Sequence, residues 1–445
     1  MIDTRTSNLL LFLFGLFALL QVKLIGSIGI SEIVVYLLAP FVFIGNIRLL
    51  RHDGFMPIIY LSFMVMTGCT LSSWHNNTPL PLFARGFAQI YSLFAFPVVF
   101  HKLIRDNLRG VRWLLLGMCI SMVVNVFVFR QSYEVSMLAG GLNNDDTTRL
   151  IMNGPLFWLN RVGNFLVWPM EGWYFQTPMP FTLFSVVAMA IFSMVTSDSG
   201  RSATAYAIAA AGVICMGGKS IRRMRKLQNH FWTLAIGGLC LAVLLKAGYN
   251  FLAKNQLLNE KAQHKYERQF KQGGGLVQIL VGGRSETFAG LLACFDEPIW
   301  GFGPWSYDEK GYYINFVAKY GTAEDYDDFH KRYEQARMMG FLPSMPSHSH
   351  IIGFWIRYGI LGLPYWLYIV YCMYRHFRRN MAAIPQWFGM MTLWLVSNCW
   401  HVIFSPYGRR VNDMLFVTCL LLCDAVRRGR IPLPYEMQSE AMQHP

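Results

Sequence analysis

Apolar runs of about 18 to 22 residues recur along this chain, and they restrict its fold more than any other feature. A helix needs roughly 20 predominantly apolar residues to cross the ~30 Å hydrocarbon core of a bilayer. Hydrophobic residues make up 54% of the sequence and charged residues only 14%, which is too apolar for an ordinary soluble domain. We therefore predict an all-α polytopic membrane protein.

Eleven of these runs are clear membrane spans. No small-residue cleavage site clearly follows the first of them, so we expect a retained span and not a removed signal peptide. The predicted spans are residues 8–22, 26–44, 55–71, 80–100, 111–129, 177–195, 204–216, 231–251, 351–371, 385–404 and 412–426.

Basic clusters between the spans indicate their orientation, because Lys and Arg are enriched in cytoplasmic loops. Eleven spans would leave one cluster outside, so a twelfth crossing is required between residues 130 and 176. Residues 151–170 are the candidate, and their polar and proline residues predict a helix that is broken or buried in the bundle. About 12 transmembrane helices then place both termini in the cytoplasm. The clusters lie at residues 48–51, 102–112, 219–226, 375–379 and 427–430.

This topology divides the chain into four parts. Residues 1–253 form transmembrane helices 1–9, and residues 254–347 form a large external loop domain. Residues 348–428 form helices 10–12, and residues 429–445 form a cytoplasmic tail. The loop is expected to be partly helical, with Ser285 starting a short apolar helix that runs through Cys294.

The distribution of charge argues against a nucleic-acid partner, and the cysteine content argues against a disulfide within the external loop. The net charge is +14, but the basic residues form short clusters between apolar runs, so we exclude a nucleic-acid partner. None of the nine cysteines forms a CxxC pair. Cys294 is the only cysteine in the external loop, which therefore cannot close a disulfide on itself.

Two histidines, His348 and His350, stand where the external loop meets the third-last span. A neutral imidazole can accept a proton near pH 7, so either residue is a candidate general base at a membrane-embedded site. The alternative is that both histidines only cap the helix at the interface.

Three arginines on the external side are candidates for binding an anion. Arg284 follows a glycine pair and heads a helix, Arg201 sits at the external end of a span, and Arg85 lies one or two turns inside an apolar run. The alternatives are a surface arginine for Arg284 and an interfacial snorkelling residue for Arg201. Glu32, in the second span, is a weaker candidate for lining the same cavity.

An aromatic cluster in the loop allows two interpretations. It could form a wall on which sugars stack, or it could form an interfacial aromatic belt. In the first case Trp305 and Tyr307, together with His350, are the candidate contacts of the acceptor or of a sugar. The residues of the cluster are Trp300, Trp305, Tyr307, Tyr312 and Tyr313.

Several catalytic signatures are missing from the sequence. There is no HExxH, no P-loop, no GxSxG and no aspartate pair of the metal-binding type. We expect metal-independent chemistry without a cofactor. Arginines suit a diphosphate, and a histidine suits deprotonation of a hydroxyl, so a lipid-linked diphosphate sugar is the natural donor.

Four stretches in order resemble the O-antigen ligase / O-antigen polymerase (Wzy-type) superfamily of bacterial membrane glycosyltransferases. They are Ser-Gly-Arg-Ser-Ala at residues 199–203, Gly-Arg-Ser at 283–285, Pro-Ile-Trp-Gly-Phe-Gly-Pro at 298–304, and His-Ser at 348–349 followed by Gly-Ile-Leu-Gly at 359–362. The large external loop before the histidine also agrees. The first five spans match only in type.

The resemblance implies metal-independent transfer of an undecaprenyl-diphosphate-linked glycan in the periplasm, with inversion at the sugar. It assigns the base to His348, from its spacing to Gly359, and diphosphate binding to Arg201, Arg284 and Arg85. Two departures from the family pattern concern the acceptor: Ser349 replaces the usual asparagine, and Arg357 stands where an acidic residue is common.

These features favour a polysaccharide polymerase of the bacterial inner membrane that extends a lipid-linked acceptor. Its partners would be the undecaprenyl-diphosphate-linked glycan, the lipid bilayer and a chain-length regulator. An O-antigen ligase that transfers the glycan to lipid A-core is the alternative within the family. A transporter or flippase of lipid-linked sugars is the alternative of another class, and it would not need His348 as a base.

Overall fold

The computed structural model describes residues 4–18, 21–23, 27–127, 255, 285–320, 345–381, 383–384, 387–408 and 410–433. Of these residues, 80% are helical, which confirms a mostly helical protein. Three described helices are long and apolar enough to cross a membrane: α2 (Ile30–Asp53), α3 (Met56–His75) and α4 (Leu80–Ile104). The protein is therefore membrane-associated. The predicted total of about 12 spans includes segments outside the described residues.

Helix α4 lies at the centre of the described bundle and packs against α2, α3 and α21 (Arg410–Arg427). Helix α1 (Thr4–Ala18) packs along α5 (Val111–Phe127), where Gly15 and Gly117 let the two backbones approach closely. A short hairpin of β1 (Gln21–Lys23) and β2 (Ser27–Gly29) joins α1 to α2; its strands are antiparallel, with Val22 opposite Ile28.

The third-last predicted span is broken in the structure. Residues 351–371 were expected to form one helix, but they divide into α18 (His350–Tyr358), a 3-10 turn η2 (Gly359–Gly362) and α19 (Leu363–Arg375). Gly359 has φ +62, a backbone conformation that ends a helix and that other residues rarely adopt. The break makes room for the loop turn described below.

The rest of the C-terminal part packs around α18 and α19. A π-helical turn η3 (His376–Asn380) follows α19, and α20 (Phe388–Phe404) and α21 complete the bundle. The buried side chains of α4, α18, α19, α20 and α21 belong to one apolar core.

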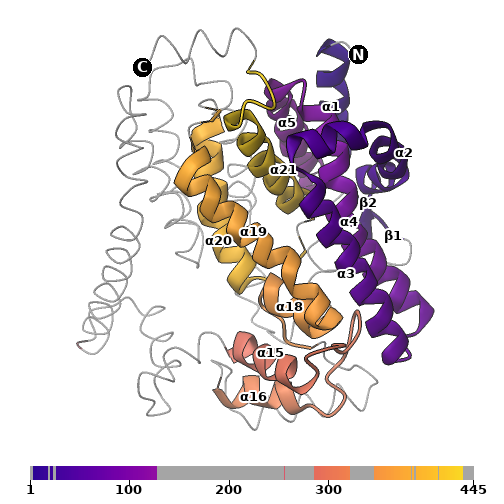
Figure 1. Cartoon of the computed structure of the whole chain (residues 1–445). Coiled ribbons are helices and arrows are strands. Elements are labelled where there is room, and N and C mark those ends of the chain that lie inside the picture. Colours follow the sequence, from indigo (N-terminus) through magenta and orange to yellow (C-terminus); the bar gives the residue numbers. More distant parts are fainter. Residues whose placement is uncertain are drawn as a thin grey trace.

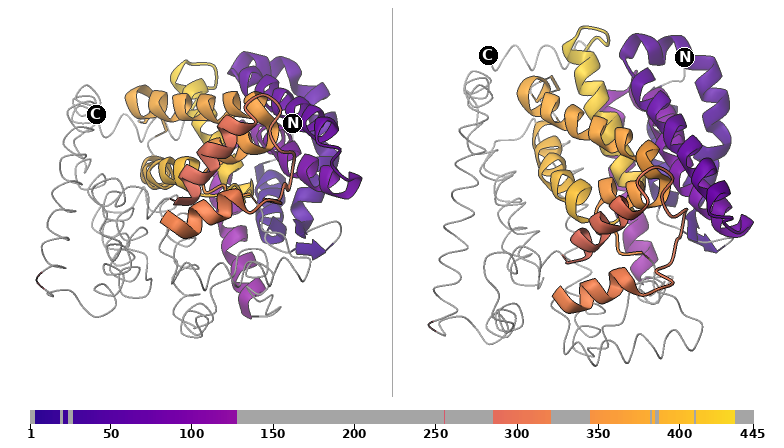
Figure 2. Two further views of the ribbon diagram at one scale, coloured as in Figure 1. Left: turned by 90° about the horizontal axis from the view of Figure 1, so that it is seen from below. Right: turned by 60° about the horizontal axis from the view of Figure 1, so that its bottom comes forward.

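Two helices of the segment predicted to be external form a second layer at one end of this bundle. They are α15 (Ser285–Asp296) and α16 (Tyr312–Tyr320). At the other end, a 3-10 turn η1 (Leu108–Gly110) joins α4 to α5. α15 and α16 share a small core of Ala289, Ala293, Cys294 and Tyr313, which reaches α18 through Ile356. Helices α15 and α16 lie at the end of the described structure that is opposite the start of α1 and the end of α21 (Figure 1). Seen from below, they lie across this end of the bundle (Figure 2).

The basic clusters that the structure describes gather at the end of the bundle opposite α15 and α16. Arg105, after α4, pairs with Asp53 at the end of α2, with 2.6 Å between nitrogen and oxygen. Arg375, at the end of α19, pairs with Asp424 near the end of α21 at 3.1 Å. Placing these clusters at one end is what the positive-inside rule requires of a membrane bundle.

Candidate functional site

The His348 imidazole lies just before α18, at the end of the bundle that faces α15. Its side chain is 54% exposed, and its Nδ1 pairs with the Glu286 carboxylate from the first turn of α15. With Nδ1 donating to this carboxylate, Nε2 carries the lone pair. The arrangement presents an oriented proton acceptor to the space outside the bundle.

His350, two residues later, has a different environment. Its side chain is only 3% exposed, its Nδ1 lies 2.7 Å from the carbonyl oxygen of His401, and its Nε2 lies 3.3 Å from the Asp413 carboxylate. Its ring also packs edge-on against Trp366. The expectation that His350 contacts the glycan is therefore corrected: it anchors the start of α18 inside the bundle, because the helix turns it inward.

Ser349, and neither histidine, caps α18. Its Oγ accepts a hydrogen bond from the Ile352 amide at 3.2 Å, as an N-cap serine does. The same hydroxyl lies 3.2 Å from the Val402 carbonyl, to which it donates. The residue after His348 is thus fixed to both α18 and α20, and this holds the backbone beside the imidazole in place.

The turn that follows α15, at residues 298–304 and called the loop turn here, docks against α18 and the start of α4. Backbone hydrogen bonds join Phe302 to the Ile356 carbonyl at 2.7 Å and Gly303 to the Arg357 carbonyl at 3.2 Å. The Asn76 side chain, after α3, donates to the Gly301 carbonyl at 2.8 Å. This turn therefore connects the α15–α16 segment with the helices of the bundle.

Trp305 follows this turn, and two arginines lie near its ring. The Arg85 guanidinium lies 3.7 Å from its ring centroid, and that of Arg357 lies 5.6 Å from it. Trp305 itself has φ +58, which is rare for a residue with a Cβ and is typically found at functional sites. The structure thus brings together two predicted site residues, Arg85 and Trp305, with the unassigned Arg357.

Arg85 is more accessible than the sequence suggests. It occupies the second turn of α4 (Leu80–Ile104), as its place in the apolar run predicts, but its side chain is exposed and not buried there. Its charge is held over the Trp305 ring by a cation–π contact, which is worth about 0.5–2 kcal/mol. This position near the helix end avoids the cost of a charge at mid-membrane depth.

A series of polar contacts continues from Arg357 into the bundle. Its guanidinium lies 3.5 Å from the Gln89 side-chain oxygen, and the Gln89 amide donates to the Tyr407 carbonyl at 3.0 Å. Deeper, Glu32 forms an ion pair with Arg410 at 3.0 Å, so Glu32 is an internal partner and not a cavity-lining group. Sequence reasoning missed Arg357 and Arg410 as site components, although both are charges at the ends of apolar helices.

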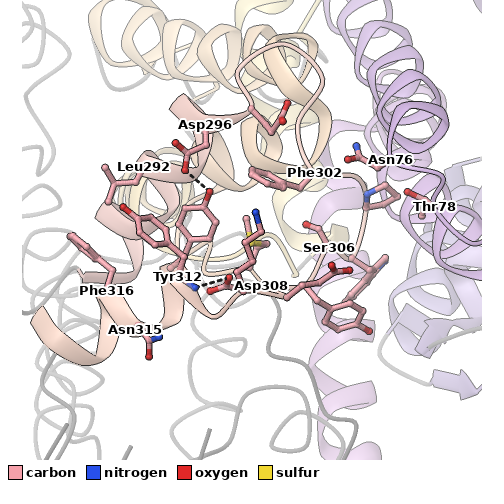
Figure 3. Close-up of a pocket in the computed structure, with 18 of the residues that line it drawn as sticks. Asn76, Thr78, Leu292, Asp296, Phe302, Ser306, Asp308, Tyr312, Asn315 and Phe316 are labelled. Carbon is pink, nitrogen blue, oxygen red and sulfur yellow. Dashed lines mark hydrogen bonds between the residues drawn. The ribbon is translucent and has the colours of Figure 1, made fainter. Parts of the chain in front are cut away.

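A cavity of about 1290 Å³ lies between α15, α16, the loop turn and the start of α4 (Figure 3). Trp305 and Tyr307 both line it, as do Tyr312 and Tyr313. Trp300 lies outside this lining and stacks on His75, with 5.7 Å between ring centroids. Four of the five predicted aromatic residues therefore share one cavity.

Two further predicted site residues, Arg201 and Arg284, lie outside the described residues. Burial raises the pKa of the Cys294 thiol to about 12, so Cys294 does not supply a thiolate near neutral pH. Within the described residues, no group of three or more His, Cys, Asp or Glu side chains could hold a metal ion.

Comparisons with known proteins do not identify a family. No family model matches the chain, and neither does any curated protein or solved structure.

Proposed function

We propose that this protein is a polysaccharide polymerase that transfers an undecaprenyl-diphosphate-linked glycan to a lipid-linked sugar acceptor. The observation that carries the proposal is the exposed imidazole of His348, oriented by Glu286 at the end of an apolar helix bundle. A nearby aromatic cavity and the Arg85 guanidinium add groups that suit a sugar and a diphosphate. The sequence motifs around residues 199–362 provide independent support.

The proposed reaction is a displacement at the anomeric carbon of the donor sugar. His348 Nε2 accepts the proton of an acceptor hydroxyl while the hydroxyl oxygen forms a bond to that carbon. The bond between the carbon and the diphosphate oxygen breaks, and undecaprenyl diphosphate leaves with the electron pair. Attack opposite the leaving group inverts the configuration at the anomeric carbon.

Arginines would stabilise the charge that develops on the leaving diphosphate. We assign this role to Arg201 and Arg284 from the sequence, with Arg85 assisting at the start of α4. Arg357 is a further candidate, since its guanidinium also lies near the Trp305 ring, 5.6 Å from the centroid. No metal ion is required in this scheme.

The proposal includes a location. The reaction would take place at the periplasmic face of the bacterial inner membrane, with both termini in the cytoplasm. A chain-length regulator would be a partner of a polymerase, whereas lipid A-core would be the acceptor of a ligase.

Reconstitution of the purified protein with the undecaprenyl-diphosphate-linked repeat unit tests the function directly. Products are separated by size, with and without lipid A-core. A ladder of lipid-linked oligomers without lipid A-core is the expected result. Product that forms only with lipid A-core would identify a ligase instead.

A histidine variant separates transfer from transport. We expect His348→Ala to lower kcat by about 10²- to 10⁴-fold, the usual contribution of a general base. His75→Ala, which removes another exposed histidine at the same end, is the matched control and should retain activity. Normal glycan output from a folded His348→Ala protein would contradict catalysis and favour a transporter.

A further inference from the structure

The cavity beside α16 has walls of two chemical kinds. Aromatic rings occupy one part, and Tyr312 and Tyr307 are accessible there, at 60% and 43% exposed. Acidic and amide side chains also line the cavity, among them Asp296, Glu297 and Asn315. Figure 3 shows Tyr312, Asp296 and Asn315 around the same hollow. Rings that offer an apolar face beside hydrogen-bonding groups match the two kinds of surface on a sugar.

The charges in this cavity do not suit a diphosphate. Among the described lining residues, four carboxylates stand against two ammonium groups, those of Lys310 and Lys319. Arg85 and Arg357 contact the Trp305 ring, but neither of them lines the cavity. An anionic ligand would therefore meet unfavourable charge in the cavity, while neutral hydroxyl groups could donate hydrogen bonds to the carboxylates.

The aromatic wall is already ordered. The Asp308 carboxylate accepts hydrogen bonds from the amides of Tyr312 at 3.0 Å and Ile314 at 2.8 Å, which fixes the start of α16. The Tyr313 hydroxyl donates to Asp296 at 2.5 Å, and burial together with this hydrogen bond raises the pKa of Tyr313 well above its usual range. A wall held in this way loses little conformational entropy when a ligand binds.

Three lining residues also have polar atoms that lack a hydrogen-bond partner among the described residues. These atoms are Trp305 Nε1, Ser306 Oγ and Asn315 Oδ1, and all three are shielded from solvent. An unpaired buried polar group costs about 1–3 kcal/mol, so such groups are uncommon in a closed core. Beside a cavity, they are groups that a hydroxyl-rich ligand could satisfy after small side-chain rotations.

We propose that this cavity binds neutral sugar units of the glycan, apart from the site that holds the diphosphate. Its volume exceeds the ~300–1,000 Å³ of pockets for drug-sized ligands, so it suits several linked sugar rings. The inference rests on the proposed function for the identity of the glycan, but binding at this cavity requires no transfer step. Tyr312 and Tyr307 provide the stacking surface, and the acidic groups accept hydrogen bonds from the sugar hydroxyls.

Calorimetric titration of the full-length protein in lipid nanodiscs tests this proposal. The probe is the repeat-unit oligosaccharide of the bacterium that carries the gene, released from its lipid diphosphate by mild acid. We expect saturable binding, weakened about tenfold by Tyr312→Ala and little changed by Tyr312→Phe, which keeps the ring. Phe295→Ala removes an exposed aromatic ring of α15 outside the cavity, and it should bind like the unmodified protein.

A competition experiment distinguishes the cavity from the diphosphate site. Inorganic diphosphate should not displace the lipid-free oligosaccharide if the sugar lies among the carboxylates. Displacement by diphosphate, equal loss of affinity in Tyr312→Ala and Phe295→Ala, or no binding by the unmodified protein would each overturn the proposal.

The outcome is also distinguishable from failure of the proposed function. Binding of the oligosaccharide without any transfer in the reconstituted assay would retain the sugar cavity and reject the polymerase. Transfer with an unchanged KM in Tyr312→Ala, and without measurable oligosaccharide binding, would retain the polymerase and reject the cavity.

Discussion

At the scale of single residues, the start of α18 separates two neighbouring histidines by environment. His348 extends toward Glu286 and solvent, while His350 is enclosed between the His401 carbonyl and the Asp413 carboxylate. An imidazole that is to take a proton from a substrate needs an accessible nitrogen, and one that anchors a helix needs buried partners. The two residues should therefore respond in opposite ways to substitution.

We predict that His350→Ala destabilises the protein while His348→Ala does not. Loss of His350 leaves the buried Asp413 carboxylate without this partner, and an unsatisfied buried polar group costs about 1–3 kcal/mol, in addition to the packing lost against Trp366. Loss of the half-exposed His348 should cost no more than about 1 kcal/mol, as for surface pairs. Thermal unfolding in detergent measures both, and equal melting temperatures for the two variants would contradict the assignment.

Glu286 is predicted to be a positioning residue for His348. We expect Glu286→Gln to lower kcat by at least about tenfold, because the carboxylate no longer fixes the imidazole tautomer. KM and the melting temperature should change little, since Glu286 is assigned no contact with substrate and lies at the surface. A variant that raises KM at constant kcat would instead place Glu286 in substrate binding.

At the scale of elements, the break between α18 and α19 determines how the turn after α15 docks on the bundle. A Cβ on Gly359 would lie 1.8 Å from the Ile299 carbonyl oxygen, and the Ile360 amide donates to that same oxygen at 3.2 Å. The close approach of these two backbones is possible only with glycine in the left-handed conformation. The turn that carries Trp305 therefore depends on the interrupted helix.

Gly359→Ala should consequently loosen the loop from the bundle. The positive φ alone costs about 1–3 kcal/mol with an alanine, and the clash with Ile299 adds to it. Limited proteolysis should cut the loop faster, and the melting temperature should fall. Gly45→Ala is the matched control, because that helical glycine has no atom within 4 Å of an added Cβ and should be neutral or stabilised.

Sequence patterns predicted where the helices lie better than where they break and how they contact one another. Apolar length identified α2, α3 and α4 as spans, because hydrophobicity over about 20 residues is a local property. The same property could not show the break at Gly359, since the reason for it is a turn some 60 residues earlier in the chain. Likewise, His348 could be selected from its place at a span end, but Glu286 and Arg357 become site residues only through contacts between distant segments.

At the scale of the whole molecule, the bundle has chemically different ends. α15, α16 and the cavity beside them occupy one end, while basic clusters and their acidic partners occupy the other. His376 belongs to the basic end, in the turn after α19, and is buried. Its two ring nitrogens have no hydrogen-bond partner within the described part of the chain.

Burial lowers the pKa of His376 to about 4, and this should make stability depend on pH. The unfolded chain, with a pKa near 6.5, binds this proton before the folded protein does. The free energy of unfolding should therefore fall by up to about 3 kcal/mol as the pH decreases from about 6.5 to 4. His376→Leu should flatten this part of the profile in thermal unfolding, and an unchanged slope would exclude His376 as its cause.

The contact between Glu286 in α15 and His348 before α18 joins the loop helices to the bundle, so the orientation of the imidazole depends on the docking of the loop. The bundle fixes the backbone beside His348 through Ser349, whereas α15 supplies the carboxylate that aligns the imidazole. The base of the proposed reaction is complete only while the loop is seated. If the loop were displaced from the bundle, His348 would lack the carboxylate that aligns it. Water that attacks a bound donor would then have no aligned general base, so hydrolysis of the donor would be slow.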